Sequence, residues 1–194
     1  MSPCDALLMS AKPRIERAAL EAFVVEGVDA TTTKTIAARA GVSEGAIYRH
    51  WKSKDALAVG LFMDCHRRLS TLIEDEATAA DGIKAKAAAL VHAYCAVADE
   101  DWLLFSFHLL QLHHFLPYYQ EDGRDPVTLV ESLIKRAMIN AELPPGDPRV
   151  LAAMAIGVIT QTAQNKAYGR LGADALSAHA PLMTAAVQAV LFAR

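Results

Sequence analysis

The stretch from Thr32 to Lys54 constrains the fold of this chain more than any other, because residues that start and stop helices punctuate it. Thr32 carries the hydroxyl of a helix N-cap, which accepts a hydrogen bond from the unpaired N–H groups of the first turn. Gly41 is typical of a helix end, since glycine adopts a left-handed backbone without steric cost. Ser43 then caps a second helix. Two short helices joined by the turn 41–43 predict a helix-turn-helix.

The second helix of this motif has the composition of a helix that reads DNA. Gly45 and Ala46 keep its start slim, which lets the backbone lie deep in a major groove. Ile47 is expected to point back into a small core. Between residues 33 and 54 the chain carries five Lys and Arg residues against one acidic residue. Because basic side chains, hydroxyls and helix N-termini together bind phosphates, this segment predicts a nucleic-acid contact.

This segment resembles the DNA-binding region of the TetR family of bacterial transcriptional regulators. The resemblance rests on the glycine turn, on Tyr48 and His50, and on the aromatic-Lys-Ser-Lys run that enters the next helix; it covers about residues 12–57. Trp51 stands where the family usually carries Phe, and both side chains are aromatic. The resemblance implies a helical homodimer built on its two C-terminal helices, with an inducer cavity among its middle helices.

The predicted DNA contacts form two sets. Members of the first set are expected to hold the phosphate backbone: Thr33, Lys34, Tyr48, His50 and Lys54. Members of the second set are expected to face the base edges: Ser43, Glu44, Gly45, Ala46 and Arg49. In this second set Arg49 is the candidate for a bidentate contact with guanine, and the Ala46 methyl group for a contact with thymine.

The distribution of charge along the chain supports a DNA contact at the N-terminal end. Of the 194 residues, 53% are hydrophobic, which is enough for a core and suggests that some apolar surface is buried against another chain. Residues 1–56 carry eight basic and seven acidic groups, whereas residues 57–194 carry eleven and fifteen. The acidic C-terminal part would be repelled by DNA, which turns the basic end toward it.

Cysteine usage and hydropathy indicate the compartment. Cys4, Cys65 and Cys95 are widely spaced and form no metal-like pattern, which favours a reducing environment. The N-terminus lacks the basic start and long apolar run of a secretion signal. No stretch reaches the ~18 apolar residues of a membrane span. We therefore expect a cytoplasmic protein without a membrane partner, and the family resemblance implies a bacterial one.

The rest of the chain predicts helices and no strand. Ser53 starts a long helix that begins inside the DNA-binding unit and ends outside it. The pattern predicts an all-α fold of nine helices, with a helix-turn-helix domain over residues 1–52 and a helical ligand-binding and dimerisation domain over residues 53–194. Besides the two helices of the motif, the expected helices are 12–26, 53–76, 83–98, 100–116, 125–141, 148–168 and 178–192.

The C-terminal domain contains the residue types of a small-molecule site, namely aromatic walls with a few polar groups. The predicted lining is Tyr94, Trp102, Phe105, His108, Tyr118, Met138 and Gln161. Each of these residues alone also fits a plain core. The weak charge of this region favours an apolar or aromatic ligand over a phosphorylated one. His113 and His114 are adjacent and cannot form an i,i+4 metal pair. A site made by His108 with His92 or an acid is the alternative, but histidines hydrogen-bonded in a pocket or at the surface are favoured, so neither a metal nor a cofactor is predicted.

The last two helices carry small and mid-sized residues at spacings of three and four, which allow close helix approach. Paired with their symmetry mates they predict a four-helix dimer interface. Packing within one chain is the alternative. The predicted interface residues are Met154, Gly157, Val158, Gln161, Thr162, Met183, Ala186, Val187 and Val190.

These features together predict a dimeric repressor that releases a pseudo-palindromic double-stranded DNA operator when a small molecule binds. Two copies would contact half-sites about 34 Å apart, or a multiple of that distance. No catalytic triad, Cys/His dyad or phosphate loop supports an enzyme. Two alternatives stay open: an activator on the same fold, and a small helical carrier or enzyme with a vestigial DNA-binding head.

Overall fold

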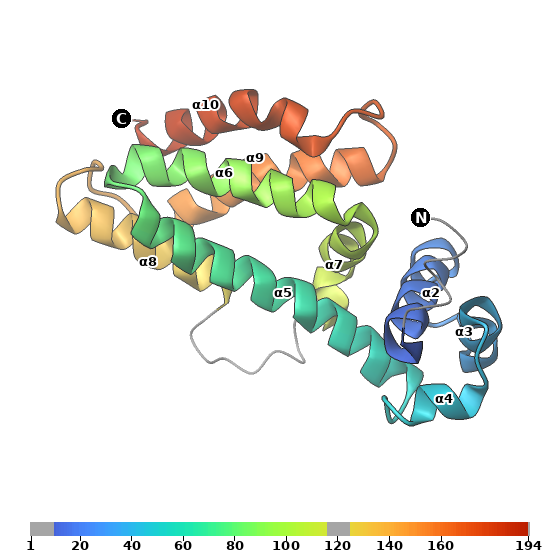
Figure 1. The fold of residues 1–194 in the computed structure, drawn as a ribbon. Helices are drawn as coiled ribbons and strands as arrows, with labels where there is room; N and C mark the ends of the chain where they lie inside the picture. The colour runs from blue at the N-terminus through green and yellow to red at the C-terminus, as the bar shows by residue number, and fades with distance from the viewer. Residues whose placement is uncertain (1–9, 116–124, 194) are drawn as a thin grey trace.

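The computed structural model describes residues 10–115 and 125–193, and over these residues every regular element is helical (Figure 1). Its nine α-helices and the absence of strands there confirm the predicted all-α fold. In chain order the elements are α2 (Ala11–Glu26), α3 (Thr33–Ala40), α4 (Glu44–Tyr48), α5 (Lys54–Ala79), α6 (Gly82–Glu100), α7 (Trp102–Phe115), α8 (Pro126–Ile139), α9 (Pro148–Ala167), the 3-10 turn η2 (Leu176–His179) and α10 (Ala180–Leu191).

Side-chain caps start most of the helices that the sequence predicted. The Thr32 hydroxyl accepts from the Thr35 N–H at 3.1 Å, and the Ser53 hydroxyl accepts from the Ala56 N–H at 3.0 Å. Gly41 ends α3 with a φ of 63°, the left-handed conformation that favours glycine. Ser43 is the N-cap residue of α4, as predicted, and has an extended backbone, but its side chain makes no capping hydrogen bond.

The junction between α6 and α7 lies further along the chain than predicted. The expected helices were 83–98 and 100–116, but α6 continues to Glu100 and α7 begins at Trp102. Asp101 breaks the helix and accepts a hydrogen bond from the Leu104 N–H at 3.2 Å, which caps α7. Asp99 instead holds the start of η2, because its carboxylate accepts from the Leu176 N–H at 2.6 Å.

Two apolar cores divide the molecule, and α5 runs through both (Figure 1). The first core joins α2, α3, α4 and the start of α5 to two phenylalanines of α7, Phe107 and Phe115. The second core lies among the far half of α5 and the helices α6 to α10. Since α5 has 26 residues, it spans about 39 Å and connects the helix-turn-helix unit to the far end of the molecule.

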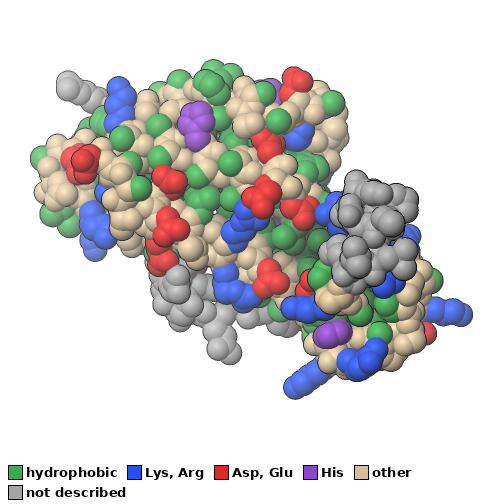
Figure 2. Space-filling view, in the orientation of Figure 1, with side chains coloured by type: hydrophobic (Ala, Val, Ile, Leu, Met, Phe, Trp, Pro, Cys, Tyr) green, Lys and Arg blue, Asp and Glu red, His purple; other side chains and the backbone are tan. Residues whose placement is uncertain are grey.

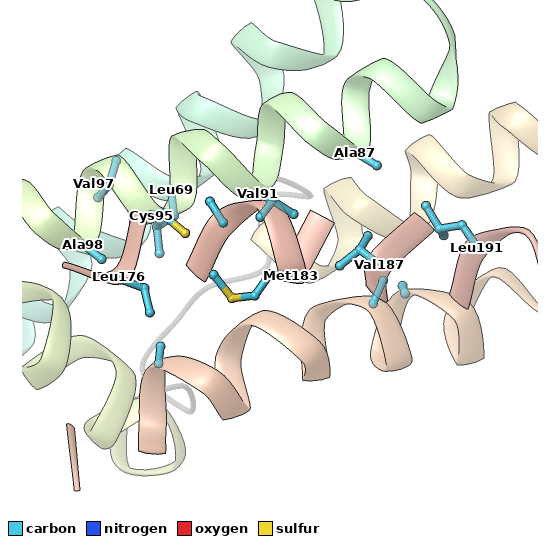
Figure 3. Packing of buried hydrophobic residues seen from close by; sticks show 14 of the residues in the cluster. Leu69, Ala87, Val91, Cys95, Val97, Ala98, Leu176, Met183, Val187 and Leu191 are labelled. Atoms are coloured by element: carbon cyan, nitrogen blue, oxygen red, sulfur yellow. The ribbon is translucent and has the colours of Figure 1, made fainter. Parts of the chain in front are cut away.

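Helix α10 packs onto α6 through a continuous apolar face (Figure 3). Met183 and Val187 lie in this interface, with 3% and 5% of their surface exposed. Their predicted role in dimerisation is therefore wrong, because their side chains are used within the chain. Pro181 lies in the first turn of α10, where proline costs no hydrogen bond. Across the described residues, no helix is long and apolar enough to cross a membrane.

Candidate DNA-binding surface and ligand cavity

Helix α4 presents one face to solvent and one to the core. Tyr48 and Arg49 are exposed, as are the three residues at its start, Ser43, Glu44 and Gly45. Ile47 points into the core as predicted, and Ala46 lies beside it with 4% of its surface exposed. The predicted contact between the Ala46 methyl group and thymine is therefore corrected, because this methyl group packs inside the protein.

Three cations near the motif are free to bind phosphates. Lys34, Arg49 and Lys52 are exposed, and none of them makes a hydrogen bond or ion pair with another described residue. Figure 2 shows Lys and Arg side chains that project from the region of α3 and α4. His50 is exposed beside them, with its ring 5.3 Å from that of Trp51. Lys52 was missing from the predicted contacts although it lies in the same basic run.

Lys54 has a different role from the predicted one. Its half-buried ammonium group donates to the carbonyl oxygens of Val28 at 2.5 Å and Asp29 at 3.2 Å. It thereby ties the start of α5 to the loop between α2 and α3. This charge is already bound to backbone oxygens, so the prediction that Lys54 holds a phosphate is corrected.

Arg14 performs a similar task on the helix-turn-helix itself. Its guanidinium donates to the carbonyl oxygens of Ala40 at 2.5 Å and Gly41 at 2.9 Å, which satisfies the free end of α3. Thr33 donates to Glu44 Oε2 at 2.9 Å and joins the starts of α3 and α4. These contacts hold α4 at a set angle on α3. The sequence could not identify them, because Arg14 is 26 residues away from Ala40.

A cavity of about 990 Å³ opens in the C-terminal domain among α5, α6, α7, α8 and α9. Most of its walls are aliphatic, with polar groups concentrated near Asp125. The residues that line it are His66, Leu69, Leu72, Ile73, Leu90, Tyr94, His108, Leu109, Leu112, His113, Asp125, Pro126, Val127, Thr128, Val130, Ile156, Ile159 and Thr160.

Two members of the predicted lining, Tyr94 and His108, do face this cavity, and Tyr118 lies outside the described residues. The other four do not line it. Phe105 is buried in the core, with its ring edge-on to Tyr94 at 4.9 Å and stacked on Trp102 at 5.9 Å.

Met138 and Gln161 lie outside the cavity for different reasons. The Met138 methyl carbon is 3.6 Å from where a Cβ of Gly146 would stand, so it fills the loop after α8. Gln161 is exposed on α9. The residue types alone therefore did not distinguish cavity-lining residues from core residues. The direction of each side chain depends on how the helices pack.

A buried chain of polar groups crosses one end of the cavity. His66 Nδ1 lies 3.2 Å from His108 Nε2, and His66 Nε2 lies 3.4 Å from Asp125 Oδ1. Both imidazole rings stack on Phe62, at centroid distances of 5.5 Å and 4.6 Å. We call these three polar residues the His66–His108–Asp125 relay. His66 and Asp125 were not predicted, since they come from different helices and share no local pattern with His108.

The protonation of the relay follows from its surroundings. Burial, helped by the neighbouring His66, lowers the pKa of His108 to about 3, so this ring is neutral near pH 7. Hydrogen bonds from His66 and from Thr128 lower the pKa of Asp125, which is therefore ionised. The described residues contain no group of three His, Cys, Asp or Glu side chains that could hold a metal ion.

Helix α7 connects the cavity to the helix-turn-helix unit. His108 and Leu109 face the cavity, while Phe107 packs into the first core and stacks on Phe23 of α2 at 5.7 Å. At the start of α7, Asp101 accepts from Arg17 of α2 at 3.0 Å. The cavity and the DNA-facing unit therefore share two helices, α5 and α7.

Apolar side chains are exposed on α9 and α10. Met154 and Leu182 have 51% and 75% of their surface exposed, and a Cβ added at Gly157 would meet no atom within 4 Å. The remaining predicted interface residues are partly or fully exposed: Val158, Gln161, Thr162, Ala186 and Val190. Exposed apolar patches of this kind are typical of protein interfaces.

The fold and these two sites define a helical DNA-binding protein with a separate, ligand-sized cavity. Residues 15–61 match the family model for bacterial regulatory proteins of the tetR family. The chain thus carries the DNA-binding region of the TetR family, and the resemblance predicted from its sequence is confirmed.

Two curated relatives from Bacillus subtilis match the same end of the chain. YerO, an uncharacterized HTH-type transcriptional regulator, is 46% identical over 46 residues, which cover 24% of this chain and 16% of YerO. YvkB, of the same description, is 39% identical over 61 residues, which cover 31% of this chain and 32% of YvkB. The matched segments thus span about a third or less of either relative.

Solved structures match over nearly the whole length. The fatty acid degradation regulator FadR from Bacillus halodurans superposes with a TM-score of 0.77 at 21% identity, covering 92% of this chain and 93% of that one. FadR from Bacillus subtilis in complex with stearoyl-CoA gives 0.72 at 19% identity, covering 93% and 97%. The TetR family regulator PfmR from Thermus thermophilus gives 0.75 at 17% identity, covering 92% and 97%. At such identities the likeness shows the fold.

Proposed function

We propose that this protein is a dimeric transcriptional repressor that releases its operator when a small molecule occupies the cavity. One observation carries the proposal: α5 begins beside the helix-turn-helix and its far half lines the cavity. A role on operator DNA also places the protein in the cytoplasm.

Base recognition is assigned to the exposed face of α4, with Arg49 as its main reader. Arginine binds guanine through two parallel hydrogen bonds, and the Arg49 side chain is exposed and unpaired among the described residues. Lys34 and Lys52 take the phosphates on either side, together with the exposed Tyr48 and His50. Because Thr33 and Glu44 bind one another in the free protein, they act first by setting the angle of α4.

DNA binding is tested by fluorescence anisotropy with fragments from upstream of the gene and its neighbours. Arg49→Ala should weaken binding by about 1–3 kcal/mol and relax the base preference. Lys135→Ala removes a positive charge from the exposed surface of α8, away from the motif, and should leave binding unchanged. Equal losses of DNA affinity in both variants would show that the effect comes from the net charge of the protein, and would refute the assignment of Arg49.

The dimer is assigned to the exposed apolar face of α9 and α10. Leu182→Glu should produce monomers in analytical ultracentrifugation and weaken operator binding, because a single helix-turn-helix rarely achieves specific affinity alone. Ile139→Glu is the matched control, since Ile139 is 73% exposed on α8, outside this face. A dimer that survives Leu182→Glu but not Ile139→Glu would move the interface to α8.

Release requires that the ligand bind the DNA-free form more tightly than the DNA-bound form. The stearoyl-CoA complex of the structural neighbour FadR supports a cavity that takes a molecule with a long apolar part. Repression itself is tested by deleting the gene: transcripts from the bound promoters should rise. A fall in those transcripts would identify an activator instead.

A further inference from the structure

The described lining of the cavity offers no Lys or Arg side chain to a bound molecule. Within the described residues, Asp125 is the single acidic group of the lining. The remaining polar groups are hydroxyls and histidines. Burying an anion in such walls without a positive partner is strongly unfavourable. The negative charge of Asp125 is already bound by the Thr128 N–H at 3.0 Å and by His66, so little of it is left to attract a cation. The walls therefore favour an uncharged molecule.

The ring nitrogens of the two histidines form a chain that ends at the ionised Asp125. His66 Nε2 lies 3.4 Å from Asp125 Oδ1, and His66 Nδ1 lies 3.2 Å from His108 Nε2. These distances leave Nδ1 as the nitrogen of the His108 ring that takes no part in the relay.

This Nδ1 atom of His108 lacks a partner in the described part of the chain. The hydrogen bond to His66 uses the other ring nitrogen, and no further contact of a described residue satisfies Nδ1. His108 nevertheless has only 4% of its surface exposed and lines the cavity. Stacking on Phe62, with 24° between the rings, fixes its orientation. A ligand group that hydrogen-bonds to this nitrogen gains a directed contact in a site shielded from water, and a hydroxyl group can make it as donor or as acceptor.

We propose that the cavity is a site for an uncharged, mainly aliphatic molecule that carries a hydroxyl group, and that this hydroxyl forms a hydrogen bond with Nδ1 of His108. The aliphatic body lies along Leu69, Leu72 and Ile73 of α5 and along Ile156 and Ile159 of α9. This inference rests on the proposed function only in treating the cavity as the effector site.

The test measures binding without DNA, so that failure of the inference is distinct from failure of the proposed regulator. Full-length protein is loaded with the neutral dye Nile red, which is then displaced at pH 8 by molecules that share one chain length. These are dodecan-1-ol, dodecanoate, dodecylammonium and dodecanoyl-CoA. Dodecan-1-ol should displace the dye at a concentration at least tenfold lower than any of the charged molecules. Equal or tighter binding of dodecanoate, dodecylammonium or dodecanoyl-CoA would overturn the inference.

The role of His108 is tested with matched variants. His108→Phe keeps an aromatic ring but removes the ring nitrogen, and should weaken the binding of dodecan-1-ol about 3- to 10-fold, the range of one neutral hydrogen bond. His108→Gln restores a side chain that can both donate and accept, and should recover part of the loss. His113→Phe is the control, because His113 lines the same cavity from α7 but lies outside the relay. Circular dichroism confirms that each variant is folded. An unchanged affinity in folded His108→Phe would refute the hydrogen bond.

Discussion

In the helix-turn-helix unit, cationic side chains donate hydrogen bonds to backbone carbonyls. In the C-terminal domain that contains the cavity (the cavity domain), apolar faces of neighbouring helices pack on one another. Arg14 and Lys54 bind the carbonyl oxygens that end α3 and follow α2. In the cavity domain, Met183 and Val187 of α10 pack instead onto α6. Directional bonds set the angle of one short helix, as base reading needs. Apolar burial is non-directional, so it can hold helices around a cavity without fixing the angle of each contact.

The two regions meet at Phe62, and the predictions below test how far they are independent. Phe62 belongs to the first core, which contains the helix-turn-helix, yet its ring also stacks on the His66 and His108 imidazoles of the relay. A change at this residue should affect both regions. Changes elsewhere should affect one of them.

Phe62→Ala should have the largest effect, a loss of about 3–5 kcal/mol in the free energy of unfolding, because Phe62 is fully buried. Urea unfolding at fixed protein concentration measures it. The fluorescence of Trp51 reports on the DNA-facing unit, and that of Trp102 reports on α7. A variant that keeps only one of the two tryptophans therefore shows the unfolding of one region. Both probes should shift to lower urea together. If only one of them shifts, the two regions are energetically separate.

Acidification should weaken the cavity domain through His108. Its native pKa is lowered to about 3, so on unfolding near pH 5 the chain takes up a proton that the native state does not hold. Stability therefore rises with pH between about 3 and 6.5 and is lost as pH falls through that window. Between pH 7 and pH 5 the loss should be about 2 kcal/mol. His108→Phe should flatten this part of the profile; the same slope in the variant would assign it to other groups.

Gly41→Ala should affect the DNA-facing unit. A side chain there must adopt the left-handed φ of 63°, and its Cβ would stand 3.0 Å from Arg14 Nη2. The strain should cost about 1–2 kcal/mol of stability, and the displaced guanidinium should weaken DNA binding. Dye binding in the cavity should stay unchanged. Loss of dye binding would show that the turn is coupled to the cavity.

Gly45→Ala should have the smallest effect on stability, a gain of about 0.5–1 kcal/mol, because alanine is the better helix former. The new Cβ would have only Ser43 Oγ within reach, at 3.9 Å, and would project from the exposed start of α4. DNA binding should nevertheless weaken, since the methyl group holds α4 away from the groove floor. Gly60→Ala, in the second turn of α5, is the control with no expected effect on DNA affinity, because its new Cβ would meet Trp51 at an ordinary contact distance of 3.7 Å.

Much of the fold was predictable because its signals are local. The caps at Thr32 and Ser53 and the turn at Gly41 each involve residues within one helical turn of each other. The helix-turn-helix and its family follow from such signals. The junction at residues 99–101 was placed wrongly because acids suit the start of a helix but do not prevent the preceding helix from continuing.

The candidate sites were less predictable. The exposed residues of α4 could be assigned from the motif alone, whereas Ala46 and Lys54 could not. Both have side chains suited to the predicted contact, but α2 and its loop turn one into the core and bind the other to carbonyl oxygens. Likewise, the spacing of apolar residues such as Met183 and Val187 along α10 indicated a buried helix face. It did not show whether the same chain or a second copy covers that face.

The sequence by itself determined the helices, their order, and a basic helix-turn-helix at one end, because these depend on neighbours along the chain. The tertiary structure decided which polar groups meet. His66 and His108 are 42 residues apart, and Asp125 comes from a third helix start, yet their side chains form one relay. No spacing rule connects them, because their distance in space depends on how α5, α7 and α8 pack around the cavity.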